Sequence, residues 1–136
     1  MIEYKKYKIF ENLTDKEIDL FSDQIKTKSY NQNITIISEG EKGDSILFLL
    51  EGEISITKTL TLPIGKNSGS DVVEKEFGRL KSNQYISFGE NSLFSSDKKR
   101  TATVKALTSC EIGFLNEIDF IKICESNYEV GYKVLK

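Results

Sequence analysis

The 136-residue chain predicts a mainly β domain with one helix at its N-terminal end and short helices at its C-terminal end. Between residues of about 28 and 116, β-branched and apolar runs alternate with glycine-bearing turns, as in sandwiches and barrels. A helix-capping signal precedes this stretch and an amphipathic pattern follows it. Since no internal repeat or composition shift divides the chain, we expect a single domain over residues 1–136.

The N-terminal helix is predicted from a capping box. Thr14 and Glu17 have the Thr-x-x-Glu spacing in which each side chain satisfies a backbone N–H at the first helical turn. Ile18, Phe21 and Ile25 follow at the spacing of one helical face. We therefore predict a helix over residues of about 14 to 25, held against the sheet by its apolar face.

The strands of the middle region are predicted from β-branched runs and from alternation of apolar and polar residues. The runs lie at residues 34–37, 45–50, 54–58, 77–80, 102–106 and 112–114. Residues of about 60 to 74, which include Pro63 and Gly65, predict a long hairpin connection. The aromatic residues expected in the core are Phe48, Phe77, Phe88, Phe94 and Phe114.

Residues of about 117 to 136 predict one or two C-terminal helices. A first helix is expected from Glu117 to Glu125, with Ile118 and Ile121 facing inward. A second is expected from Tyr128, where its two tyrosines favour helix packing over a contact with a ligand.

Composition excludes several classes of function. The chain has no histidine, which removes Ser-His-Asp and Cys-His nucleophiles and the usual zinc and iron sites, so we expect no catalysis, metal or cofactor. Cys110 and Cys124 are expected to be reduced. A net charge of −2 does not favour nucleic-acid binding, and the longest apolar run, Ile46 to Leu50, is too short for a membrane. A cytoplasmic location is the resulting expectation.

The segment from Phe88 to Val104 contains the residues that favour a ligand site. Gly89 allows a ligand to approach the backbone, and the N–H groups of the turn that follows can bind an anion. Arg100 carries a planar fork that pairs with a phosphate, whereas Glu90 would repel one. Glu90 is therefore expected to accept a hydrogen bond from a sugar hydroxyl. Together these groups indicate a small nucleotide with few phosphates.

Three segments, in order and at compatible spacing, resemble the cyclic nucleotide-binding domain of catabolite activator proteins, kinase regulatory subunits and gated channels. Residues 39–44 and 49–53 resemble the two glycine turns of that family, and residues 88–104 resemble its phosphate-binding cassette. The resemblance implies an eight-stranded double-stranded β-helix, a jelly-roll-like β-roll, over residues of about 28 to 116. It also implies that the helices at about 117 to 136 act as a lid.

The resemblance also implies the site residues. Arg100 would bind the cyclic phosphate, and Glu90, ten residues earlier, would bind the ribose. The full set that the resemblance implies is Phe88, Gly89, Glu90, Asn91, Ser92, Arg100, Thr101 and Ala102. Thr101 is compatible with either cAMP or cGMP, so the purine stays open. Residues 82–87 depart from the family because they lack its glycine, and Asn83 is expected to supply a positive φ there.

The predicted function is a cyclic nucleotide (cAMP or cGMP) sensor without catalysis, which passes ligand occupancy to an effector domain or partner protein through its C-terminal helices. A homodimer is left open, and neither nucleic acid nor a membrane is expected as a partner. One alternative is a β-roll interaction module that no longer binds a ligand. Another is a metal-dependent enzyme on a similar fold, such as a cupin, which the absence of histidine disfavours.

Overall fold

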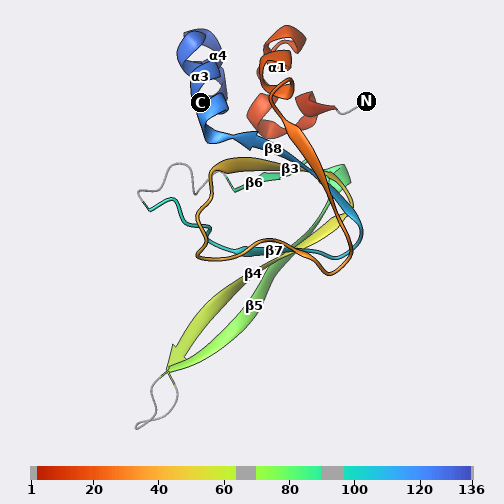
Figure 1. The fold of residues 1–136 in the computed structure, drawn as a ribbon, viewed down its shortest axis with the longest axis vertical. Coiled ribbons are helices and arrows are strands. Elements are labelled where there is room, and N and C mark those ends of the chain that lie inside the picture. Colours follow the sequence, from red (N-terminus) through yellow and green to blue (C-terminus); the bar gives the residue numbers. More distant parts are fainter. Residues whose placement is uncertain (1–2, 64–69, 90–96, 136) are drawn as a thin grey trace.

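Two four-stranded antiparallel sheets form the body of the molecule, and the helices cover one of them (Figure 1). The computed structural model describes residues 3–63, 70–89 and 97–135. The first sheet has the strand order β1-β8-β3-β6 and the second the order β2-β7-β4-β5. The predicted mainly β fold with flanking helices is confirmed.

The described residues contain eight strands. They are β1 (Lys26–Tyr30), β2 (Thr35–Ile37), β3 (Ser45–Glu51), β4 (Glu53–Pro63), β5 (Ser70–Lys81), β6 (Ser87–Phe88), β7 (Thr103–Ala106) and β8 (Cys110–Asn116). The helices are α1 (Asp15–Ser22), α3 (Glu117–Ser126) and α4 (Tyr128–Leu135), with 3-10 turns η1 (Tyr4–Lys6), η2 (Lys8–Phe10) and η3 (Ser82–Gln84).

Strand β3 is buried on both faces and separates two apolar cores. Ile46 and Phe48 point into a core shared with the helices. Leu47 and Leu49, which alternate with them, point into the space between the two sheets. The strand is buried from Ser45 to Leu49, which agrees with its almost continuous apolar run, and it reaches the surface at Glu51.

Aromatic side chains fill the core under the helices. Phe10 stacks on Phe48 with ring centroids 5.4 Å apart, and Phe21 lies 5.2 Å from Phe10 and 5.8 Å from Phe120. Tyr7 is also buried there and its hydroxyl donates a hydrogen bond to the Leu49 carbonyl. This core anchors α1 and α3 to the outer face of the first sheet.

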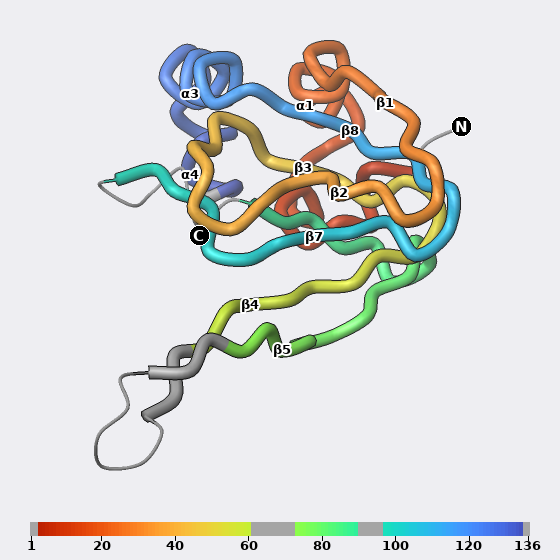
Figure 2. Tube along the Cα trace, turned by 60° about the horizontal axis from the view of Figure 1, so that its bottom comes forward, coloured from red at the N-terminus to blue at the C-terminus, as the bar shows by residue number. Residues whose placement is uncertain are grey.

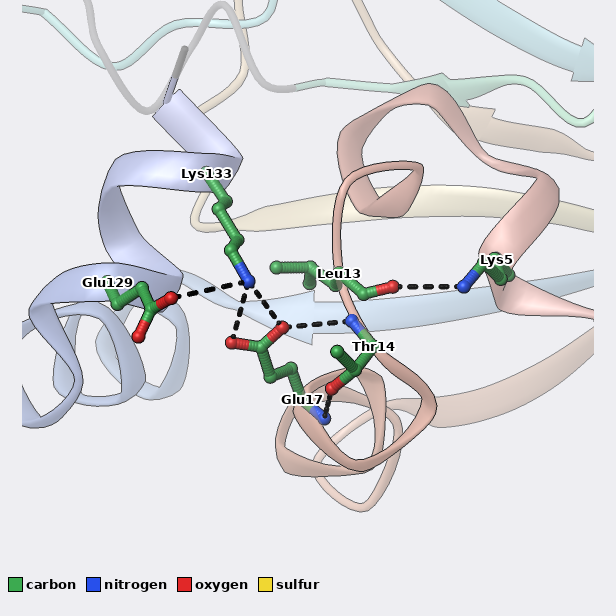
Figure 3. A network of polar contacts seen from close by, with 6 residues as sticks. All are labelled: Lys5, Leu13, Thr14, Glu17, Glu129 and Lys133. Atoms are coloured by element: carbon green, nitrogen blue, oxygen red, sulfur yellow. Dashed lines mark hydrogen bonds and ion pairs between the residues drawn. The ribbon is translucent and has the colours of Figure 1, made fainter.

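A shared glutamate connects the first and last helices (Figure 3). The predicted capping box is present: the Glu17 N–H donates to Thr14 Oγ1, and the Thr14 N–H donates to Glu17 Oε1. Lys133 of α4 lies with its Nζ 2.9 and 3.2 Å from the two oxygens of the same carboxylate. The hydrogen bonds from Thr14 and Lys133 lower the pKa of Glu17, and Glu17 raises the pKa of Lys133.

Strands β4 and β5 continue beyond the sandwich as a protruding hairpin (Figures 1 and 2). The prediction of a connection over residues 60 to 74 was wrong in its extent, because β4 runs to Pro63 and β5 begins at Ser70. Phe94, which was also predicted in the core, lies outside the described residues. The core assignment of Phe77 was wrong. Phe77 sits at the register shift opposite Ile56 and Thr57, and 54% of it is exposed.

The helices differ from the prediction in three details. Tyr128 and Tyr132, which were predicted to pack against other helices, are exposed. Helix α1 ends at Ser22, so that Ile25 lies just outside it, before β1. In α3 the inward residue is Phe120, whereas Ile118 and Ile121 are exposed. The spacing of the two isoleucines fits one helical face, but the larger ring next to them fills the core.

Candidate functional site

A pocket of about 290 Å³ opens between the cassette and the second sheet. Its walls are mostly apolar. The lining residues are Ile37, Ile56, Lys58, Leu80, Ile86, Ser87, Phe88, Gly89, Arg100, Thr101, Ala102 and Val104. Ligand sites are typically concave, mainly apolar and supplied with a few convergent polar groups, and this cavity fits that description.

Arg100 is a buried cation at this pocket. Only 6% of the residue is exposed. Its Nη1 donates to the carbonyl oxygens of Ser45, at 3.1 Å, and Gly89, at 3.0 Å. Burial lowers the pKa of Arg100, while Asp44 and Glu41 act in the opposite direction. An arginine keeps its proton in proteins, and its planar fork of N–H donors suits an oxyanion, so Arg100 is the candidate anion-binding group of this pocket.

The first glycine turn holds the backbone of Arg100. The Gly40 N–H donates to the Arg100 carbonyl at 2.8 Å, and the Arg100 N–H donates to the Glu41 carbonyl at 2.7 Å. The Gly43 N–H bonds the Lys98 carbonyl in the same way at 2.8 Å. Residues 39–44 were predicted only as a turn. In the structure they also form backbone hydrogen bonds with residues 98–100, and these bonds fix the position of the Arg100 backbone.

The backbone at Gly89 favours glycine. Its φ is +88°, in the left-handed region where side chains are strained. A Cβ built there would clash with Nη1 of Arg100 and would lie 3.2 Å from Leu47 Cδ1. A side chain at residue 89 would therefore displace the guanidinium.

The segment over residues 82–87 makes its turn in an unexpected way. The positive φ lies at Tyr85 (+51°) and not at Asn83. The Lys81 N–H donates to Gln84 Oε1 at 2.7 Å, which closes the 3-10 turn η3. The chain then returns to the sheet at Ser87 and Phe88, so Phe88 and Gly89 reach the pocket without the family's glycine.

Five of the eight predicted site residues line this one pocket. They are Phe88, Gly89, Arg100, Thr101 and Ala102. The other three, Glu90, Asn91 and Ser92, lie outside the described residues. The prediction missed the walls contributed by the strands and by the residue before β6. The strand residues are Ile37, Ile56, Lys58, Leu80 and Val104, and the residue before β6 is Ile86. The period-two pattern around Ile54 and Ile56 was the signal that could have indicated which side chains face inward.

An ion pair and a backbone hydrogen bond join residues near Arg100 to the start of helix α3. Lys98 Nζ lies 2.5 Å from Glu117 Oε1, and the Glu117 N–H donates to the Asp44 carbonyl at 2.7 Å. Glu117 is the first residue of α3. The loop that carries Arg100 and the turn at residues 40–44 are therefore both in contact with the C-terminal helices.

In the part of the chain that the structure describes, no helix combines the length and apolarity that a membrane crossing requires.

The family model described as "Cyclic nucleotide-binding domain" matches residues 27–127. A cAMP-dependent protein kinase regulatory subunit of Mycosarcoma maydis is 33% identical over 98 residues, which cover 72% of this chain and 16% of the relative. A cGMP-dependent protein kinase of Plasmodium berghei is 28% identical over 121 residues, which cover 89% of this chain and 12% of the relative.

Among solved structures, the catabolite activator protein of Thermus thermophilus has the same fold, with a TM-score of 0.73 and 21% identity over 93% of this chain and 54% of that one. The cAMP-bound structure of PfPKA-R has a TM-score of 0.67 and 30% identity over 88% of this chain and 38% of that one. The chain spans between 12% and 50% of the length of the curated relatives it matches. The family model covers most of the chain, which therefore belongs to the cyclic nucleotide-binding domain family.

Proposed function

We propose that this cyclic nucleotide-binding domain holds its ligand in the pocket beside Arg100 and passes occupancy to an effector or partner through its C-terminal helices. The observation that carries the proposal is a buried guanidinium in a mostly apolar pocket, held by Gly89 and by the backbone of residues 40–43. Such a site suits one compact anionic group attached to a flat apolar one, which is the chemistry of a cyclic nucleotide.

The proposed roles follow the chemistry of each group. Arg100 pairs with the cyclic phosphate, together with the backbone N–H groups of Gly89, Asn91 and Ser92. Glu90 accepts a hydrogen bond from the ribose 2′-hydroxyl. Phe88 and the apolar strand residues pack against the purine, and Thr101 and Ala102 line the same pocket as Arg100.

The proposed route to the helices starts at the cassette. When Arg100 turns toward a phosphate, residues 98–100 move with it, and Lys98 is bonded to the first residue of α3. Helix α4 follows α3 and is held to α1 by Lys133 and Glu17 (Figure 3). A ligand shifts this equilibrium only by its difference in affinity for the two arrangements. We further propose one non-catalytic domain over residues 1–136, located in the cytoplasm.

The test is a calorimetric titration of the full chain with cAMP and cGMP, repeated on Arg100→Ala and on Lys99→Ala. Removing Arg100 should cost roughly 2–5 kcal/mol of binding free energy, a loss of about 30- to 4,000-fold. Lys99 is exposed, adjacent and outside the pocket lining, so Lys99→Ala should bind like the parent chain. Thermal unfolding without ligand checks that both variants are folded.

The rival is an interaction module with the same fold and no ligand. At about a hundredfold excess over Kd, a true ligand stabilises the folded state by about 2.7 kcal/mol. If neither cyclic nucleotide raised the melting temperature of the parent chain at millimolar concentration, the interaction module would become the better description.

A further inference from the structure

The mouth of the pocket carries a second cation, Lys58, which no predicted role uses. Among the described residues that line the pocket, Lys58 and Arg100 are the two with a positive charge. Arg100 is buried, whereas Lys58 is exposed on β4, one residue beyond the stretch of β4 that pairs with β7. The two charges therefore stand at different depths of the same cavity.

The strand register directs Lys58 to the pocket side of β4. Ile54 and Ile56 face the core between the sheets, and Lys58 follows two residues later on the same face. Its neighbour across the hairpin is Lys75. Of the nearby acids, Glu76 pairs with Arg79. Glu74 and Lys58 both line a second hollow beside Thr57 and Thr59, and no ion pair joins the two side chains.

Both lysines approach the exposed ring of Phe77. The Nζ atoms of Lys58 and Lys75 lie 5.7 and 5.8 Å from its centroid, within cation–π range. Among the described residues, no carboxylate lies within ion-pair distance of either ammonium. Like charges directly opposite each other in a sheet destabilise it, so the mouth holds positive charge that an acceptor on a ligand would offset.

We infer that Lys58 reads the purine and gives this site a preference for guanine. The inference rests on the proposed function: with the cyclic phosphate at the buried Arg100, the base extends along the strand wall to Lys58, which lines the same cavity. Guanine presents two acceptors there, N7 and O6, whereas adenine presents the acceptor N7 beside the donor N6. An ammonium donates only, so it matches guanine at both positions and adenine at one.

The test compares three ligands by calorimetric titration of the full chain: cGMP, cAMP and cyclic inosine monophosphate. The inosine ligand keeps N7 and O6 but lacks the 2-amino group of guanine. The parent chain should bind cGMP and the inosine ligand about five- to tenfold more tightly than cAMP. Lys58→Met should bring the three affinities within about twofold of one another, mainly by weakening the two ligands that carry O6.

Lys75→Met is the matched control, because it removes the same charge from the same hairpin at a residue outside the pocket lining. It should keep the preference, and thermal unfolding should show both variants folded. Equal affinity of the parent chain for cGMP and cAMP would overturn the inference. So would a preference that Lys58→Met leaves intact, an equal loss for all three ligands, or tight binding of cGMP alone, which would assign recognition to the 2-amino group.

Failure of the inference and failure of the proposed function give different results. Binding of cyclic nucleotides that depends on Arg100 but not on the base removes only the role of Lys58. Absence of binding by all three ligands removes the site itself, and the role of Lys58 with it.

Discussion

The two faces of β3 border two cores of different character. On the helix-covered face, Phe48 packs against the aromatic rings of Tyr4, Tyr7 and Phe10 within a core of buried side chains. On the other face, Leu47 and Leu49 belong to a core that opens into a cavity and ends at a buried arginine. Close packing fixes the first region, whereas the second keeps apolar surface uncovered where a ligand could lie.

The largest contrast is expected in the free energy of unfolding. Phe10→Ala removes a fully buried ring from the helix-covered core and should cost about 3–5 kcal/mol. Ile56→Ala, on the pocket wall, should cost less than about 2 kcal/mol because its side chain already borders open space. Urea unfolding of the two variants measures both values. Equal costs would mean that the pocket side is packed as tightly as the helical side.

A pair of glycine substitutions tests which region serves binding. Gly52 (φ +100°) and Gly89 (φ +88°) share a left-handed backbone, so an alanine at either should cost about 1–2 kcal/mol of stability for the backbone conformation alone. Gly52→Ala should cost more than this, because its Cβ would also clash with backbone. At Gly52 the new Cβ would meet the Ser109 carbonyl, 2.5 Å away, whereas at Gly89 it meets Arg100. Calorimetry should therefore show about a tenfold or greater loss of ligand affinity for Gly89→Ala alone. Similar affinities for both variants would contradict the role given to Gly89.

Much of the fold could be predicted because local patterns and tertiary structure agree. The Thr14–Glu17 capping box depends on residues three positions apart, and the burial of β3 follows from its own apolar run, so both could be predicted from a short stretch of sequence. Phe77 and Ile118 could not be placed, since an exposed apolar residue and a buried one look alike in a short pattern. Their environments depend on where a hairpin shifts register and on which neighbour, here Phe120, fills the core.

The candidate site divides in the same way. Gly89 and Arg100 could be selected from the sequence by residue type. A glycine lets a phosphate come close to the backbone, and a guanidinium can form two parallel hydrogen bonds with it. Lys58 could not, because its place in the pocket depends on the pairing of β4 with β5 and β7, which joins residues far apart in the chain. Long-range register, more than residue type, decides which strand side chains reach the ligand.

The smallest expected effect belongs to the contact between Glu17 and Lys133. The pKa of Glu17 is lowered in the folded state, so its stabilisation is present above its ordinary value, about 4.3, and disappears as the pH falls through the lowered value. The pKa of Lys133 is raised, so its stabilisation is present below its ordinary value, about 10.4, and disappears as the pH rises through the raised one.

Urea unfolding between about pH 7 and about pH 3 should therefore show a smaller pH dependence for Glu17→Gln than for the parent chain. Glu129→Gln is the control, because Glu129 is exposed and its Oε1 lies 3.8 Å from Lys133 Nζ, compared with 2.9 Å for Glu17. Identical pH profiles for Glu17→Gln and the parent chain would show that Glu17 does not use its charge to hold α4 to α1. The helical face would then depend on its aromatic core alone.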